Sequence, residues 1–318
     1  VKYIYEKPME HITAEDIAFR IAPCINASGR LYAKGAELPL LLLLENNEEI
    51  ADLLAGKVIE ANEKRKKIQR ECYEQMKQEA ERRIAAGDKI LVLYAPFAPS
   101  GVVGLIAGDL KEEYHRPCIV FAPKSDGTGQ VIWCGSGRSI KAYHLLNGLN
   151  RCSDLFLHYG GHELAAGMSI SADETVLEEL RTRLNEDASY LTEEDMQPVR
   201  QWDIAITEMD LTEGLYEEMN RLEPFGAGVE CPIFKMALHV KAKNNKSYEI
   251  MGTDKKHLRL YCDSYQAVGF SLAEKYLQTE LPGVMTGYGY PSENHYRGQT
   301  YKQFTLLDFE ADQAQKGK

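Results

Sequence analysis

The sequence predicts an α/β domain that follows a long helix and precedes a small all-β barrel of the OB-fold type. Three observations support this fold class. A helical spacing of apolar residues runs from position 46 to 84, an alternation of strand-like and helix-like segments follows it, and short strand-like runs fill the C-terminal part. With 318 residues, of which 44% are hydrophobic, the chain has room for two domains.

Residues 1–87 are predicted to form an interdomain segment that ends in the long connecting helix. Apolar or small residues recur three or four positions apart, and Gly87 is a typical C-terminal stop. The helix contains the basic run KRKK at residues 64–67. We interpret this run as a solvated helix face, with phosphate contact as the alternative. The chain does not begin with Met, so we expect it to be a piece of a longer protein.

Residues 88–192 are predicted to form the α/β domain. Three apolar runs are typical of strands: KILVLYA at 89–95, PCIVFAP at 117–123 and QVIWCGS at 130–136. A helix-like segment, with Ser100 as the predicted N-cap, lies between the first two runs. This spacing indicates a βαβ unit, which a helical stretch at 174–191 follows.

Residues 200–318 are predicted to form the barrel, after a polar linker at 192–201. Short strand-like runs separated by turns fit an OB-fold better than a sandwich at this length. Several tyrosines on these runs could stack on nucleic-acid bases, although half-buried strand positions are the favoured interpretation. The tyrosines are Tyr248, Tyr261, Tyr288, Tyr290 and Tyr296.

Composition narrows the class of protein. The sequence has no run of apolar residues long enough for a membrane helix. Its seven scattered cysteines include no Cys-x-x-Cys pair, which argues for a reducing cytoplasm and against a disulfide framework or a zinc site. The net charge of −11 argues mildly against nucleic acid as a partner, yet a local basic groove can exist on an acidic protein.

Three glycine-rich pieces are candidates for binding chemistry: NASGR (26–30), GSGRSI (135–140) and YGGHELAAG (159–167). Glycines let a ligand approach the backbone, and arginine forks and serine hydroxyls suit phosphate. Each motif is weak alone, because a tight turn with an exposed arginine, or a structural histidine, explains it equally well. The candidate residues are Asn26, Arg30, Ser136, Gly137, Arg138, Ser139, Gly160, Gly161 and His162. Neither a metal-ligand cluster nor a P-loop nor a nucleophile elbow is found in the sequence.

The order of these pieces resembles the C-terminal part of the RecJ family, within the DHH phosphoesterase superfamily. IAPCINASGRL, GVVGLIAGDLKEEYHRPCIVFAP, GSGRSI and YGGHELAAGMSI resemble the family's connecting segment and DHHA1 domain. LEPFGAGVECPIF, KHLRLYCDSYQAVGF and YRGQTYKQFTLLDFE resemble its OB-fold domain. The similarity extends from residue 17 to about residue 310.

The resemblance implies the substrate-binding part of a single-strand-specific 5′-to-3′ DNA exonuclease of repair and recombination. It implies Mn²⁺ or Mg²⁺ in a separate DHH domain, no cofactor on this chain, and no cleavage by this chain alone. Single-stranded DNA with a 5′ phosphate is the expected partner, with single-strand-binding or repair proteins as further partners. A non-catalytic nucleic-acid-binding protein is one alternative, and a phosphodiesterase acting on short oligonucleotides or cyclic dinucleotides is another.

The resemblance also implies residue roles. Arg30, Ser136 and Arg138 would contact the terminal phosphate, and His162 would lie in the groove as a substrate contact. The sequence departs from the family pattern at Ala98–Ser100, where Trp-His-x is common, at Asp109 and at Cys134. Each departure is expected to remove positive charge or a hydrogen-bonding group from the groove.

Overall fold

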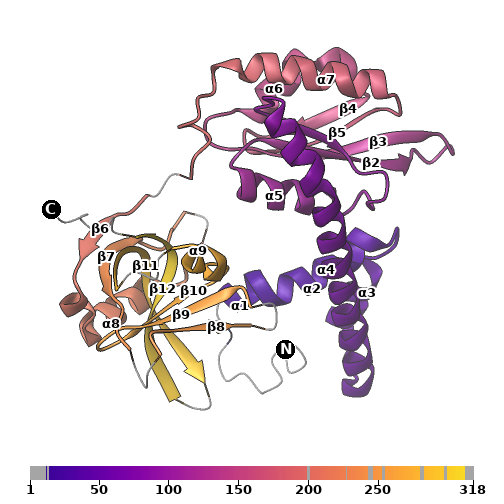
Figure 1. Cartoon of the computed structure of the whole chain (residues 1–318). Coiled ribbons are helices and arrows are strands. Elements are labelled where there is room, and N and C mark those ends of the chain that lie inside the picture. The colour runs from indigo at the N-terminus through magenta and orange to yellow at the C-terminus, as the bar shows by residue number, and fades with distance from the viewer. Residues whose placement is uncertain are drawn as a thin grey trace. The chain divides into compact units, whose positions relative to one another are not determined.

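The computed structural model of the chain consists of two compact units, Val1–Pro198 and Val199–Lys318 (Figure 1). It describes residues 12, 14–198, 201–226, 228–242, 246–252, 255–279, 283–296 and 299–311. Residues 1–11, in the first predicted domain, and residues 312–318, in the last, lie outside the described residues. The side chain of Tyr296 also lies outside them. No helix in the described part of the chain combines the length and the apolar character that crossing a membrane requires.

The first unit begins with helices that pack along one long helix. α1 (Ala14–Asp16), a π-helical turn (Ile17–Ile21), α2 (Ala22–Leu31) and α3 (Glu37–Leu44) precede α4 (Glu48–Ala85), which confirms the predicted connecting helix. The side chain of Asn47 accepts a hydrogen bond from the Ile50 amide and caps α4, and Gly87 follows the helix with a φ of +97°. The prediction of a turn at NASGR is wrong, because these residues lie inside α2.

A five-stranded sheet forms the body of this unit. Its strands are β1 (Leu91–Tyr94), β2 (Cys118–Ser125), β3 (Val131–Arg138), β4 (His158–Gly161) and β5 (Ala165–Ser171). They lie in the order β1-β2-β3-β5-β4. β1 and β2 are parallel and are joined through α5 (Val103–Tyr114), which confirms the predicted βαβ unit, whereas the other pairs are antiparallel. The prediction that Ser100 caps α5 is wrong, because Val102 occupies the N-cap position and no side chain caps the helix.

Helices cover both faces of the sheet (Figure 1). On one face, Leu91, Leu93 and Val120 pack with residues of α4 and α5 such as Met76 and Ile106. On the other face, residues such as Ile119 and Phe121 pack with α6 (Leu145–Arg151) and α7 (Glu174–Asp187). Because side chains alternate along a strand, neighbouring residues of β3 face different layers.

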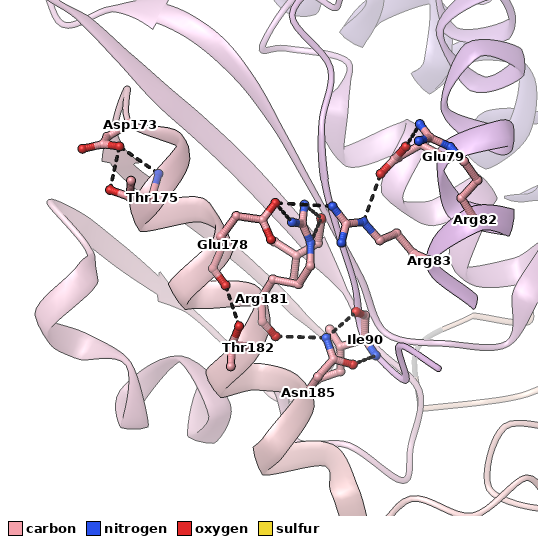
Figure 2. Close-up of polar contacts among 11 residues, drawn as sticks. Glu79, Arg82, Arg83, Ile90, Asp173, Thr175, Glu178, Arg181, Thr182 and Asn185 are labelled. Atoms are coloured by element: carbon pink, nitrogen blue, oxygen red, sulfur yellow. Dashed lines mark hydrogen bonds and ion pairs between the residues drawn. The ribbon is translucent and has the colours of Figure 1, made fainter. Parts of the chain in front are cut away.

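Two polar side chains of α7 form hydrogen bonds with the free edge at strand β1 (Figure 2). The Asn185 side-chain oxygen accepts hydrogen bonds from the amides of Lys89 (2.7 Å) and Ile90 (3.0 Å), and its side-chain nitrogen donates to the Ile90 carbonyl (3.1 Å). The guanidinium of Arg181, which is only 6% exposed, donates to the Val92 carbonyl from Nε (3.1 Å) and Nη2 (2.8 Å). These bonds satisfy backbone groups that an open sheet edge would leave unpaired.

The second unit is a curled seven-stranded sheet with two helices, which agrees with the predicted OB-fold. Its elements are β6 (Ile204–Ile206), α8 (Glu213–Leu222), β7 (Phe234–His239), β8 (Tyr248–Met251), β9 (His257–Tyr261), β10 (Gln266–Gly269), α9 (Ala273–Leu277), β11 (Val284–Tyr296) and β12 (Gln299–Ala311). The strand order is β6-β7-β11-β12-β10-β9-β8. The Lys241 amide, just after β7, donates to the Tyr261 carbonyl of β9 (2.9 Å), so the sheet curls until two strands that are not neighbours in its order approach each other, as in a barrel.

The core of the second unit lies inside this curl. Met236, Leu238, Leu260, Phe304 and Phe309 are buried there. Of the tyrosines considered as stacking residues, Tyr288 is buried and Tyr248, Tyr261 and Tyr290 are half-buried. This burial favours the interpretation that they are strand residues that pack the sheet.

Candidate functional site

The first unit brings α2 and α5 together at a glycine. A Cβ atom placed on Gly101 would lie 2.1 Å from the Arg30 carbonyl oxygen, so only glycine lets the end of α2 reach the loop before α5. The Arg30 guanidinium returns to the same residue, because its Nη1 donates to the Gly101 carbonyl oxygen at 3.3 Å. This contact places a positive charge beside the start of α5.

Ser136 and Arg138 of β3 reach the same place from the sheet. A Cβ atom on Gly104, in the first turn of α5, would lie 2.9 Å from Ser136 Oγ and 3.2 Å from Arg138 Nη2. Arg138 Nη1 donates to Ser136 Oγ (3.1 Å) and to the Gly137 carbonyl (2.8 Å). Two residues separated by one position point to the same face of a strand, which is why the GSGR motif delivers both side chains to α5.

A third guanidinium, that of Arg65 on α4, completes the arginine cluster of Arg30, Arg65 and Arg138. Its Nη2 donates to Asn62 Oδ1 (2.6 Å) and its Nη1 to Gln69 Oε1 (2.7 Å). Burial lowers the pKa of Arg65, and the charge of Arg30 lowers it further. Burial followed by the charge of Arg30 also lowers the pKa of Arg138. Arg30 therefore repels the charges of both Arg65 and Arg138.

The arginine cluster forms no salt bridge in the described part of the chain, although the carboxylates of Glu63 and Asp109 lie near Arg65. Within the described part of the chain, Arg30, Arg65 and Arg138 bond only to carbonyls, amides and a hydroxyl, and none of them forms an ion pair. Arg30 and Arg138 lie beside the start of α5, whose first amides no side chain caps. A helix N-terminus carries a partial positive charge and free N–H groups. Together these groups form a site for an anion, and the fork geometry of guanidinium suits phosphate.

An open strip of glycines extends from this site across the sheet. Ser136 of β3 is paired with Gly167 of β5, which is paired with Gly160 of β4. Paired residues share a face, so both glycines lie on the face that carries Ser136. A Cβ atom on either glycine would meet nothing within 4 Å. Gly160 and Gly167 therefore border open surface on this face of the sheet.

Gly161 differs from its neighbour Gly160. It has a φ of +153°, and a Cβ atom there would lie 2.4 Å from the Ala165 carbonyl oxygen. Gly161 is therefore required by the β4–β5 hairpin itself. Gly137 is also a packing residue, since its Cβ would lie 2.7 Å from a methyl carbon of Leu145.

Three other predicted residues stand apart from the cluster. Ser139 is only 5% exposed and its hydroxyl donates to the Tyr143 carbonyl (2.7 Å). Asn26 is exposed on α2, and His162 is exposed after β4 with its backbone amide bonded to the Ala165 carbonyl (2.8 Å). Their roles as substrate contacts remain predictions.

The departures from the family pattern have different structural effects. Ala98 is buried and Cys134 is half-buried on the face of β3 that carries Ser136. The Asp109 carboxylate accepts a hydrogen bond from Gln69 Nε2 (2.6 Å), and Gln69 in turn accepts from Arg65. Asp109 thus removes a positive charge from α5, but it also helps to hold Arg65 in place.

The side chains of the arginine cluster do not suit a metal cation. Within the described ranges, no group of three or more histidine, cysteine, aspartate or glutamate side chains is placed to hold a metal ion. Three guanidiniums beside a helix N-terminus would repel one. The arginine cluster can bind and orient an anion.

Replacing Arg65 with Gln is expected to weaken the binding of inorganic phosphate about fivefold. The reason is the loss of one partly buried charge, worth roughly 1 kcal/mol, while the amide contacts to Asn62 and Gln69 remain possible. Isothermal titration of the full chain measures the change. Lys64→Gln, on the exposed side of the same helix, is the matched control. Equal affinities of the two variants would exclude Arg65 from the site.

Comparisons with known proteins agree with this architecture. A model of the DHHA1 domain matches residues 87–189, and a model of the RecJ OB domain matches residues 202–308. The single-stranded-DNA-specific exonuclease RecJ of Bacillus subtilis (strain 168) is 32% identical over 267 residues, which cover 82% of this chain and 32% of that protein. The Escherichia coli (strain K12) exonuclease RecJ is 34% identical over 177 residues, covering 54% of this chain and 30% of that protein.

A solved structure shows the same fold. The crystal structure of RecJ in complex with Mn²⁺ from Thermus thermophilus superposes with a TM-score of 0.76 at 26% identity, covering 98% of this chain and 44% of that chain. The chain spans about a third of the length of the two curated relatives.

Proposed function

We infer that this chain, which belongs to the RecJ family through its DHHA1 and RecJ OB domains, is the substrate-binding part of a single-strand-specific DNA exonuclease. In this proposal the DHHA1 domain binds the 5′-phosphate end of a DNA strand and the OB domain holds the strand that follows. The observation that carries the proposal is the arginine cluster, whose three guanidiniums form no salt bridge within the described residues, on a protein of net charge −11.

The geometry of the cluster fits the end of a nucleic-acid strand. A terminal phosphate carries nearly two negative charges at neutral pH, whereas an internal phosphodiester carries one, so a cluster of three cations favours the terminal group. Arg30 and Arg138 offer planar forks, and Ser136 offers a hydroxyl that can donate to phosphate oxygen. The open glycine strip leaves room for the sugar-phosphate chain beside the site.

We assign the hydrolysis to a DHH domain that would use Mn²⁺ or Mg²⁺ to activate water at the phosphodiester. The Thermus relatives solved with these two ions support this assignment. The residues of this chain would bind the strand, fix its end and present the scissile bond. His162, exposed at the end of β4, would contact the strand without holding a metal.

The cellular setting is part of the same proposal. The seven cysteines are scattered and include no Cys-x-x-Cys pair, which supports a reducing compartment such as the cytoplasm. Repair and recombination are the processes that consume single-stranded DNA ends, and single-strand-binding or repair proteins are the expected partners. The RecJ OB domain favours a long single strand over a cyclic dinucleotide as the ligand.

The proposal predicts that the wild-type chain binds a 5′-phosphorylated oligonucleotide roughly 10- to 100-fold more tightly than the 5′-hydroxyl form. Arg138→Ala is expected to abolish most of this difference, because a charge-assisted hydrogen bond contributes about 1.5–3 kcal/mol. Fluorescence anisotropy with both oligonucleotides measures it. Arg183→Ala removes a cation on α7, on the opposite side of the sheet, and should leave the preference intact. Equal affinity for both oligonucleotides in the wild type would contradict the proposal.

A further inference from the structure

The second unit exposes the aromatic ring of Phe270 close to lysines that form no ion pair within the described residues. Phe270 directly follows β10 and is 59% exposed. A large apolar ring in water is unfavourable, and Phe270 is not part of the core of this unit. The next residue, Ser271, has a φ of +59°, so the turn that presents the ring holds a backbone conformation unusual for a residue with a side chain.

Two loops hold Phe270 in a defined position. The Ser271 amide donates to His257 Nδ1 (3.2 Å), and the Ala273 amide donates to the Lys256 carbonyl (3.1 Å). The rings of His257 and Phe270 lie 5.3 Å apart, edge to face. The β8–β9 loop and the β10–α9 turn are therefore joined at their ends. A ring fixed in this way loses little conformational entropy when a ligand covers it.

The charges around this ring are positive. Lys255 and Lys256 are exposed, and neither forms an ion pair within the described residues. They are the charged side chains that the structure describes on the two loops; Thr253 and Asp254 lie outside the described residues. On a protein of net charge −11, free lysines beside an exposed ring indicate an anionic ligand with a flat apolar part.

A pocket elsewhere on this unit is less suited to an anionic ligand. It has a volume of about 970 Å³ and its charged lining residues are Glu213, Asp263, Glu293, Arg259 and Lys302. Lys302 is paired with Glu213, and Arg259 is paired with Glu249. The carboxylates outnumber the cations, and the cations are already neutralised. A chain of phosphates would be repelled there, whereas the loops at Phe270 would attract it.

We propose that Phe270, with His257, Lys255 and Lys256, is a contact site for single-stranded nucleic acid on the OB domain. One unpaired base stacks on the exposed ring of Phe270, and the two lysines neutralise the phosphates on either side of that base. A duplex would not fit this chemistry, because its bases are already stacked on each other. The inference rests on the proposed function for the class of ligand, but it uses none of the residues of the arginine cluster.

The test is the affinity of the full chain for a 5′-hydroxyl oligothymidine, which has no terminal phosphate for the arginine cluster. Phe270→Ala is expected to weaken binding about 5- to 100-fold, as alanine substitution of a base-stacking residue does. Phe270→Trp should retain the wild-type affinity, because it keeps a stacking surface. Leu277→Ala, which removes an exposed apolar side chain from α9, is the matched control and should have no effect.

The lysines have their own readout, the salt dependence of binding. Each phosphate neutralised on a single strand contributes about −0.7 to the slope of log K against log salt concentration. The double variant Lys255→Ala and Lys256→Ala is therefore expected to reduce the slope by about 1.4. An unchanged slope would exclude both lysines from contact with phosphate.

The outcomes separate this inference from the proposed function. If Phe270→Ala binds like the wild type while Arg138→Ala loses its preference for the 5′ phosphate, the inference is wrong and the proposed function stands. If Phe270→Ala weakens both oligonucleotides equally and the phosphate preference persists, both stand. If the wild-type chain binds no single strand, both are wrong.

Discussion

Replacing Gly161 with Ala is expected to lower the free energy of unfolding of the first unit by about 3–5 kcal/mol. The added methyl group would lie 2.4 Å from the Ala165 carbonyl oxygen and 2.5 Å from the Ala166 Cα, and both are backbone atoms that cannot turn aside. The φ of +153° adds strain for any residue with a side chain. Overpacking against backbone costs about 1–3 kcal/mol or more, and the two effects act together.

Urea unfolding followed by tryptophan fluorescence measures this loss. The chain has two tryptophans, and Trp133 lies in the core of the first unit while Trp202 belongs to the second. A Trp202→Phe background therefore leaves Trp133 as a reporter of the first unit alone. Gly160→Ala is the matched control, because its methyl group would meet nothing within 4 Å. A loss of stability as large in Gly160→Ala as in Gly161→Ala would contradict the explanation.

Replacing Asn185 with Ala is expected to destabilise the same unit by about 3 kcal/mol. The substitution leaves the amides of Lys89 and Ile90 and the carbonyl of Ile90 without partners at the edge of the sheet (Figure 2). A buried polar backbone group that loses its partner costs about 1–3 kcal/mol, and water can reach part of this edge. The expected loss is therefore below the sum for three groups.

The same fluorescence measurement, combined with amide hydrogen exchange at Ile90, tests this prediction. We expect exchange at Ile90 to accelerate in Asn185→Ala before the unit unfolds globally. Thr182→Ala, on the exposed side of α7, is the control for a change of helix residue. Similar losses in Asn185→Ala and Thr182→Ala would show that the helix, and not the covered edge, is the source of the stability.

Much of the fold could be predicted from local patterns. The spacing of apolar residues predicts α4 because a helix that packs along one face repeats every three to four residues. The βαβ unit is visible as two apolar strands on either side of a helix of suitable length. Local composition was misleading at NASGR, because small residues suit both a turn and a tightly packed helix. In the structure Ala27 and Ser28 are buried within α2, so the segment is a packed helix and not a turn.

The candidate site was only partly visible in the sequence. Ser136 and Arg138 could be predicted as a pair because they alternate on one strand, and the family motif adds Arg30. Arg65 could not be predicted as part of the site. Four consecutive basic residues point to different sides of a helix, and the sequence does not show which of them faces inward. In the structure Lys64, Lys66 and Lys67 are exposed, in agreement with a solvated helix face, whereas Arg65 is half-buried. The sequence also does not distinguish Gly160 from Gly161, because that difference lies in strand β5 across the hairpin.

The unpaired arginine cluster also has a consequence for thermal tolerance. Arg30 repels the charges of both Arg65 and Arg138, and this repulsion lowers the stability of the ligand-free unit. A bound phosphate relieves this repulsion and stabilises the folded state in proportion to the logarithm of its concentration. The charges that favour phosphate binding at this site therefore lower the thermal stability of the ligand-free unit. Adaptation to hot conditions would therefore alter other parts of the unit and leave these arginines in place as long as the strand end must be bound.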